Sequence, residues 1–355
     1  MGTALRIALV GNWPPPHGGV SVHVEALARV LWARGVDVRV LDIGRGDHSE
    51  ARVAPARGPV RYAAGLAAVA AERRLVHLHT NGANPKSWGV ALAAGRARLP
   101  GTPRGLLTIH SGLAPAWLAV APGRRRLAAA ACAGFARVIA VSEDIADALA
   151  AAGVPRSRIS VVTPFSPAVL EGRAPPPGLA AFRAGHSPLI AAAVAPGPIY
   201  GTDLLLPAFA ELRARLPRAG LVVFGPGAAA LSGPGVLGLG EVPHVEALAV
   251  LEAADVFVRP TRADGDAVSV REALALGCTV VASALGERPP GCLLFRVGDP
   301  TALAARLAEA AAGRRPGARP PATDPFDELL ALYHAAWAGR PLPDGGRSRL
   351  RAPTF

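Results

Sequence analysis

Two acidic residues stand eight positions apart in the stretch of the chain best suited to bind a charged ligand. Asp264 precedes a helix that is predicted to open at Gly265, and Glu272 lies inside that helix. At a rise of about 1.5 Å per residue, the two carboxylates would lie roughly 12 Å apart. That distance matches the span from a sugar ring to a ribose across a diphosphate. The helix N-terminus between them offers N–H groups and a dipole that favour a phosphate.

Short apolar runs on either side of these acids are typical of buried strands. Residues 254–258 form one run, which Pro260 ends, and residues 279–282 form the other. Gly277 is predicted to end the helix between them. The order of strand, acidic loop, helix and strand indicates an open α/β sheet, in which ligands bind at the carboxyl ends of the strands.

This segment resembles the signature of the retaining glycosyltransferases of family 4, in which an acid-Gly pair and a Glu eight residues later bind a nucleotide-sugar. The family usually has Glu where this chain has Asp264. The resemblance implies the GT-B fold, with two Rossmann-like αβα domains facing across a cleft and a C-terminal helix crossing back to the first. It also implies sugar transfer from a nucleoside diphosphate sugar with retention of configuration, without a metal or other cofactor.

The resemblance assigns the donor to the second half of the chain. Glu272 would accept ribose hydroxyls, and Asp264 would accept sugar hydroxyls. Further donor-side residues that the family pattern implies in this half are Gly225, Val242, Gly265, Asp266 and Ala267.

Two cations that most family members use for the donor diphosphate are missing here. Ala195 stands about where the family has Arg, and Tyr200 stands where it has Lys. Arg259 and Arg262 are the predicted substitutes, because guanidinium suits phosphate. The alternatives are a non-catalytic GT-B scaffold with a decayed donor site, and a nucleotide-sugar epimerase of the related fold.

The first half of the chain offers a glycine pair and histidines at predicted strand ends. Gly18 and Gly19 follow three prolines in a loop similar to the Pro-rich, Gly-Gly loop of the family. The resemblance implies that these glycines bind the donor, because they let the backbone approach the donor phosphate and the acceptor closely. His110 ends the predicted strand 106–110, where the family carries a His near the sugar, so a catalytic role is implied. His79 lies near the end of the predicted strand 75–80 and is a weaker candidate on the acceptor side.

Charge is distributed unevenly along the chain. Of 38 Lys and Arg and 26 Asp and Glu, residues 1–170 carry 20 basic and 9 acidic side chains, and the remainder is close to balanced. Trp117 and Arg124, Arg125 and Arg126, expected in a loop, are the candidates for contact with an acceptor or an anionic membrane. No motif for nucleic acid recognition accompanies the charge. We expect a glycan or lipid-linked acceptor.

The composition of the chain indicates its cellular compartment and whether it holds a metal site. The chain is 51% hydrophobic, yet no uninterrupted apolar run is long enough to span a membrane. The start enters a strand directly, with no signal-peptide pattern. Cys132, Cys278 and Cys292 are widely spaced and read as reduced core thiols. We therefore expect a cytoplasmic protein, acting at the inner face of the membrane, without a metal site.

The predicted domain boundaries follow the Pro-rich linker at 174–178. An acceptor-side domain covers residues 1–170 and a nucleotide-sugar domain covers 171–322. Residues 323–338 form the crossover helix, with an apolar stripe that includes Phe326, Leu329 and Tyr333. The Pro-, Gly- and Arg-rich residues 339–355 are predicted to be a disordered tail.

Overall fold

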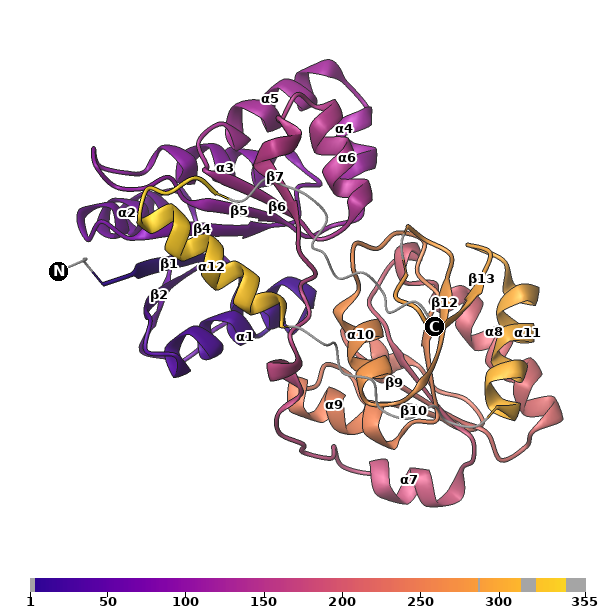
Figure 1. Ribbon diagram of the computed structural model, residues 1–355. Coiled ribbons are helices and arrows are strands. Elements are labelled where there is room, and N and C mark those ends of the chain that lie inside the picture. The colour runs from indigo at the N-terminus through magenta and orange to yellow at the C-terminus, as the bar shows by residue number, and fades with distance from the viewer. Residues whose placement is uncertain (1–3, 287, 314–323, 343–355) are drawn as a thin grey trace. The chain divides into compact units, whose positions relative to one another are not determined.

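The computed structural model describes residues 4–286, 288–313 and 324–342. The chain forms two compact units (Figure 1), residues 1–166 with 323–355 and residues 167–322. The boundary lies before the predicted linker at 174–178, which belongs to the second unit. There the Ala174 N–H bonds to the Val245 carbonyl at 3.3 Å, and Arg173 pairs with Glu252 at 3.3 Å. These contacts fix the segment to the second unit, so its prolines do not mark the division. Residues 343–355 of the predicted tail lie outside the described residues.

The first unit is built on a seven-stranded parallel sheet with the order β3-β2-β1-β4-β5-β6-β7. Ile7 of β1 pairs with Val38 of β2 on one side and Leu75 of β4 on the other. The strands are β1 Arg6–Gly11, β2 Asp37–Asp42, β3 Val53–Pro55, β4 Leu75–Thr80, β5 Leu106–Ile109, β6 Arg137–Ala140 and β7 Ile159–Val161. The α-helices are α1 Gly19–Ala33, α2 Pro59–Ala71, α3 Pro85–Arg96, α4 Ala114–Ala119, α5 Pro122–Cys132, α6 Glu143–Ala151 and α12 Pro325–Trp337.

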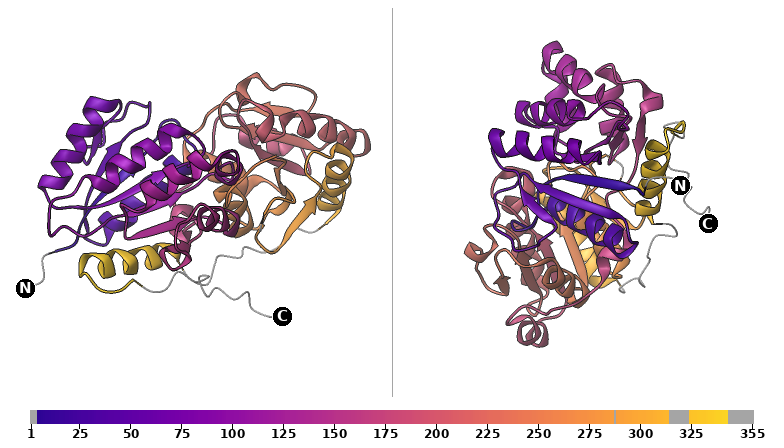
Figure 2. Two further views of the ribbon diagram at one scale, coloured as in Figure 1. Left: turned by 90° about the horizontal axis from the view of Figure 1, so that it is seen from above. Right: turned by 90° about the vertical axis from the view of Figure 1, so that its left-hand side faces the viewer.

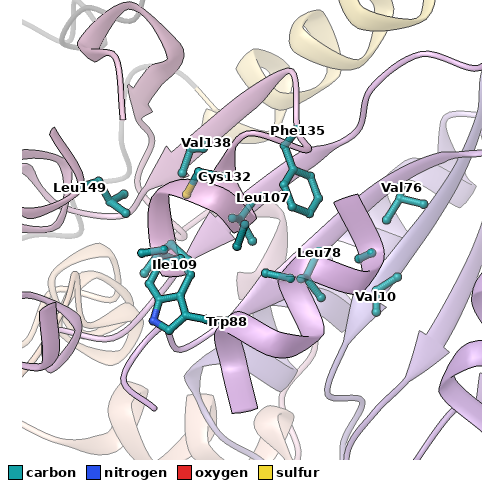
Figure 3. Close-up of a cluster of buried hydrophobic side chains, with 14 of the residues drawn as sticks. Val10, Val76, Leu78, Trp88, Leu107, Ile109, Cys132, Phe135, Val138 and Leu149 are labelled. Carbon is teal, nitrogen blue, oxygen red and sulfur yellow. The ribbon is translucent and has the colours of Figure 1, made fainter. Parts of the chain in front are cut away.

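Helices cover both faces of this sheet, because successive strand residues point to opposite sides. Ala8 and Val10 face a core formed with helices α2 to α6, part of which Figure 3 shows around Trp88 and Phe135. Ile7 and Leu9 face a second core, formed with α1 and α12. Both faces are therefore apolar, as in other parallel sheets.

The C-terminal helix α12 belongs to the first unit, which confirms the predicted crossover. Phe326, Leu329 and Tyr333 are buried in the same core as Leu27 of α1. Figures 1 and 2 show the helix, in yellow, beside the sheet of this unit. Its N-cap Asp324 accepts hydrogen bonds from the Phe326 N–H at 2.9 Å and the Ser166 hydroxyl at 2.9 Å.

The second unit is a six-stranded parallel sheet with the order β10-β9-β8-β11-β12-β13. The strands are β8 Leu189–Ala193, β9 Gly220–Phe224, β10 Val236–Gly238, β11 Val256–Arg259, β12 Thr279–Ser283 and β13 Cys292–Phe295. The α-helices are α7 Leu179–Gly185, α8 Thr202–Arg215, α9 His244–Ala253, α10 Val268–Ala275 and α11 Pro300–Ala312. Helices α8 and α11 pack on one face of the sheet, and α9 and α10 pack on the other. Two parallel α/β units confirm the predicted fold class.

Four short 3-10 helices complete the described elements. They are η1 Arg156–Arg158, η2 Pro167–Leu170, η3 Pro198–Tyr200 and η4 Ala228–Ala230. The η3 turn matters for the site, because it places Tyr200 and Gly201 beside the end of β11. Gly201 has φ +67°, and a Cβ there would lie 2.0 Å from the Pro260 carbonyl oxygen. Only glycine fits at this close approach.

Candidate active site

In the second unit, charged side chains gather where β11 and β12 end. Arg259 is the last residue of β11 and Ser283 is the last of β12, and the two strands pair in parallel. Their carboxyl ends therefore lie side by side, at the edge where ligands bind in open α/β sheets. Asp264 and Glu272 follow β11, so the fold brings both predicted acids to this half of the molecule.

The Asp264 carboxylate is the centre of a buried network. It accepts two hydrogen bonds from Arg259, at 3.0 and 3.1 Å, one from the Thr261 hydroxyl at 2.9 Å and one from Arg288 at 3.2 Å. Arg288 also donates to the Ser283 carbonyl at 3.1 Å. Four accepted bonds are about the full capacity of a carboxylate. A sugar hydroxyl would have to displace one of them, so the structure favours a role for Asp264 in positioning the two arginines.

Electrostatics keeps this carboxylate ionised. Burial by itself would raise the pKa of Asp264, but Arg259 and Arg288 together with the Thr261 hydroxyl hold that pKa below its ordinary value. The side chains of Arg288 and Asp264 are only 3% and 11% exposed. Two guanidinium groups around one carboxylate leave a net positive charge, which suits a phosphate.

Tyr200, at the position where the family has lysine, lies next to an arginine of this chain. The Arg259 guanidinium lies over the Tyr200 ring, 5.2 Å from its centroid. Arg262 bonds through its backbone N–H to the Ile199 carbonyl at 2.7 Å, and its guanidinium pairs with Asp203 at 2.7 Å. Both predicted substitute cations thus contact the segment around Tyr200. Each already has a carboxylate partner, which the sequence did not reveal.

Glu272 is buried on α10 and hydrogen-bonded. Glu272 is 5% exposed, and its Oε1 lies 2.6 Å from Nε2 of His244, the first residue of α9. Its Oε2 has no hydrogen-bond partner among the described residues. A carboxylate held on one oxygen keeps the acceptor capacity of the other, and the ribose contact stays a prediction.

Helix α10 begins three residues later than expected. It starts at Val268 with Ala267 as N-cap, so Gly265 and Asp266 lie in the preceding turn. The Asp266 carboxylate pairs with Arg271 at 2.7 Å and provides no cap for the helix. The 12 Å spacing assumed helical rise from Asp264 onward, and the turn invalidates that assumption.

Two further predicted donor residues lie after strands or in loops of this unit. Gly225 follows β9 with φ +112°, and a Cβ there would lie 2.3 Å from the Val194 carbonyl oxygen. This glycine is therefore required by the fold itself. Val242 packs its side chain in the core with α9 and α10, which leaves only its backbone for a ligand.

In the first unit, the sheet brings four histidines together. His77 bonds to the Tyr333 hydroxyl at 2.5 Å and to the Thr108 hydroxyl at 2.7 Å. Nδ1 of His79 lies 3.2 Å from Nε2 of His110. The His23 ring, on α1, lies 5.1 Å from the His79 ring and 5.0 Å from the His110 ring. The predicted residues His79 and His110 are thus neighbours.

Burial keeps these imidazoles neutral. It lowers the pKa of His23 to about 4, although the hydrogen bond with the Pro164 carbonyl opposes the shift. Burial also lowers the pKa of His77, His79 and His110 well below the ordinary value, and the neighbouring histidines add to the shift. A neutral His110 can donate or accept a hydrogen bond but carries no charge for a phosphate.

The glycine pair before α1 is not required by local packing. Gly18 has φ −143°, and a Cβ added at Gly18 or Gly19 would meet nothing within 4 Å. The Gly18 N–H bonds to the Ser21 hydroxyl at 2.9 Å, which closes the first turn of the helix. The predicted close approach of a ligand therefore has open space here.

The expected basic loop after His110 is helical. Trp117 lies on α4, and Arg124, Arg125 and Arg126 lie on α5. Trp117 stacks on Trp88, and the Arg124 guanidinium covers the Trp117 ring at 5.0 Å. A proline near the start of each helix favours helix formation there, because its fixed φ suits the first turn. Arg126 is exposed, and Arg124 and Arg125 are half-buried.

Five residues of these clusters were not singled out from the sequence. They are His23, His244, Thr261, Ser283 and Arg288. Arg288 follows a predicted strand, the position at which ligand-binding side chains are expected, and that signal could have found it. His23 lies on the apolar stripe of its helix, where a buried histidine is itself a signal.

Two parallel α/β units with polar clusters at the carboxyl ends of their strands are the architecture of the GT-B fold. Two family models match the chain: Glycosyltransferase Family 4 over residues 17–165, and Glycosyl transferases group 1 over residues 188–312. The chain belongs to the family 4 glycosyltransferases. It is a retaining enzyme of a class that uses a nucleotide-sugar donor and works without a metal ion.

Solved structures agree on the fold. Anabaena Alr3699/HepE, in complex with UDP and glucose, is 17% identical and covers 94% of this chain and 95% of its own, with a TM-score of 0.64. Sucrose-phosphate synthase from Thermosynechococcus elongatus is 19% identical over 94% and 97%, with a TM-score of 0.65. WaaG, a glycosyltransferase involved in lipopolysaccharide biosynthesis, is 16% identical over 93% and 95%, with a TM-score of 0.60. No curated protein matches the chain in sequence.

Proposed function

We propose that this enzyme transfers a hexose-like unit from a UDP-sugar to a glycan or lipid-linked acceptor. In this chemistry the bond between the anomeric carbon and the diphosphate oxygen breaks as an oxocarbenium-like centre forms. The acceptor hydroxyl oxygen then bonds to that carbon, and its proton passes to the departing diphosphate. The protein's contribution is positioning and charge stabilisation. The observation that carries the donor proposal is the Arg259–Asp264–Arg288 network at the ends of β11 and β12.

Each charged group has a role in this proposal. Arg259, Arg262 and Arg288 stabilise the leaving diphosphate, and Asp264 holds Arg259 and Arg288 in place. Glu272 accepts ribose hydroxyls through Oε2. His110 contacts the sugar as a neutral imidazole. The choice of UDP follows the solved HepE complex with UDP and glucose, a similar structure.

The rival proposal is a scaffold with a decayed donor site. Its motive is the absence of cations at Ala195 and Tyr200. The contact between the Arg259 guanidinium and the Tyr200 ring supports catalysis instead, because a cation lies next to the position that lost one.

Incubation with a panel of labelled nucleotide-sugars separates the rivals. Transferases hydrolyse their donor slowly without an acceptor, so we expect release of free sugar and UDP from one donor of the panel. Binding without turnover would support the scaffold. Conversion of the sugar nucleotide into its epimer would support the epimerase. Thermal shift with the same panel identifies the bound donor.

Replacing Arg262 with Ala should weaken UDP binding by about tenfold, because one charge-assisted contact with phosphate is worth roughly 1.5 kcal/mol. Uridine, which lacks the diphosphate, should bind as before. Arg259→Lys keeps the charge of the buried group but should still bind UDP more weakly, because a lysine ammonium cannot make the bidentate contact of a guanidinium. Arg215→Ala, at an exposed pair on α8, is the control. Equal losses for UDP and uridine would contradict phosphate binding by these arginines.

The acceptor proposal concerns the basic first unit. Among the described residues, no helix is long and apolar enough to cross a membrane. We propose peripheral contact with the cytoplasmic leaflet, where each exposed basic side chain contributes about 1 kcal/mol within a Debye length. The basic residues at the start of α5, with Trp117 beside them, are the proposed contact.

Vesicle co-sedimentation tests this contact. Binding should require anionic lipid, fall with salt, and weaken when Arg124, Arg125 and Arg126 are replaced by Ser. The matched control replaces Arg96, Arg98 and Arg104 by Ser. These three arginines line a cavity at the amino ends of the strands, so both variants lose three positive charges. Sedimentation with neutral vesicles, or equal loss in both variants, would favour a soluble acceptor.

A further inference from the structure

Three histidines from separate elements converge in the first unit. His23 lies on α1, His79 on β4 and His110 directly after β5. Each offers a ring nitrogen, and these three nitrogens lie within 4.8 Å of one another. Within residues 4–286, 288–313 and 324–342, this is the one group of three or more His, Cys, Asp or Glu side chains with such an arrangement.

The surroundings of His23 fix its tautomer. Its Nδ1 lies 2.8 Å from the Pro164 carbonyl oxygen. A carbonyl can only accept, so Nδ1 carries the proton and Nε2 carries a lone pair. That Nε2 is buried and has no hydrogen-bond partner in the described part of the chain. A histidine anchored through one nitrogen to a backbone carbonyl, with the other nitrogen available, is the usual arrangement of a metal ligand.

His79 and His110 leave a second ring nitrogen unsatisfied. They share one hydrogen bond, between Nδ1 of His79 and Nε2 of His110, while Nε2 of His79 is buried without a hydrogen-bond partner among the residues that the structure describes. Buried polar atoms normally have partners, so each exception calls for a physical explanation. We propose that His23, His79 and His110 form a binding site for a divalent transition-metal ion, Zn²⁺ in the first instance.

The chemistry of the three groups fits such an ion. Imidazole nitrogen suits zinc, copper and nickel. Zn–N bonds of 2.0–2.1 Å place tetrahedral ligand nitrogens about 3.3 Å apart, so the rings close on the ion by small rotations. Three protein ligands leave the fourth position to solvent, and the half-buried His110 provides the entry.

The ion is not a cofactor, because this class of enzyme works without one. Coordination would hold the His110 ring and keep it from the sugar, so Zn²⁺ acts as an inhibitor. This consequence rests on the proposed role of His110. Metal binding itself does not, and it is measured without a donor.

Titration calorimetry of the metal-stripped full chain with ZnCl₂ tests the site. We expect one Zn²⁺ per chain in the wild type, and binding weaker by about 100-fold in His23→Gln and His79→Gln. His186→Gln and His334→Gln, outside the cluster, are controls and should bind as the wild type does. Zn²⁺ should also raise the melting temperature of the wild type and not of the cluster variants. Co²⁺ should give the visible spectrum of a tetrahedral site.

Several results would overturn the proposal. Absence of zinc binding by the wild type is one such result, and zinc binding that survives both cluster substitutions is another. Loss of binding in His244→Gln with retention in His23→Gln would place the ion beside Glu272 instead. Should His23→Gln fail to fold, His110→Gln at the half-buried position takes its place. If Zn²⁺ binds and donor hydrolysis continues unchanged, the site stands and its inhibitory role is wrong.

Discussion

Replacing Glu272 with Ala should weaken donor binding by about 10- to 100-fold. Glu272 is 5% exposed, and its Oε1 is held by His244 at 2.6 Å. A hydrogen bond to a charged group contributes about 1.5–3 kcal/mol, and each 1.4 kcal/mol is tenfold in affinity. Removal of the carboxylate leaves the ribose hydroxyls without an acceptor. Calorimetry with UDP and with the donor found in the panel measures the loss.

Two companion variants make the Glu272 result specific. Glu272→Gln keeps the size and one acceptor oxygen, so its loss should be smaller. Glu211→Ala removes an exposed carboxylate on α8 that pairs with Arg215, and should leave donor affinity unchanged. A folded Glu272→Ala variant with wild-type affinity would show that the family role does not apply to this residue.

Replacing Asp264 with Asn should destabilise the second unit by about 3–5 kcal/mol, the typical result of removing one partner from a buried ion pair. Arg259 and Arg288 would then face each other without a counter-charge, in side chains 12% and 3% exposed. For a unit of this size the melting temperature should fall by roughly 10 °C. Calorimetric or optical melting of the Asp264→Asn variant and the wild type measures this fall in melting temperature.

The matched control is Asp203→Asn. It breaks the Arg262 pair, in which Asp203 is 59% exposed, and should cost about 0–1 kcal/mol. A cost at Asp264 no larger than at Asp203 would contradict the network as a stabilising unit. The family pattern, with Glu at this position, by itself predicts that Asp264→Glu is tolerated. The four hydrogen bonds around Asp264 now favour a cost of about 1–3 kcal/mol from overpacking.

The pH dependence of the Asp264 effect has a defined sign. The folded-state pKa of Asp264 lies below its ordinary value. A depressed folded pKa stabilises the protein above the unfolded pKa, near 3.9, and that contribution disappears as pH falls through the lower folded pKa. The difference in stability between wild type and Asp264→Asn should therefore be full at pH 7 and shrink below about pH 4.

The amino-acid sequence by itself determined the class of fold and the segments that carry chemistry. Apolar runs such as 254–258 and 279–282 became β11 and β12, because parallel strands buried on both faces require such runs. The apolar stripe with Phe326 and Tyr333 identified a packed helix for the same reason. The acid-Gly pair and Glu272 indicated the family, which the family models confirm. These are local patterns of period and spacing.

The tertiary structure alone decided which charges meet. Arg288 reaches Asp264 from 24 residues away, and His244 reaches Glu272 from 28. His23 meets His79 and His110 only because α1 packs on the sheet beside the ends of β4 and β5. Such contacts depend on strand order and helix packing. These bring together side chains that are far apart in the sequence and belong to no common helix or strand pattern. The fold was therefore predictable from the sequence, whereas the partners of each charged group depended on how the sheets assemble.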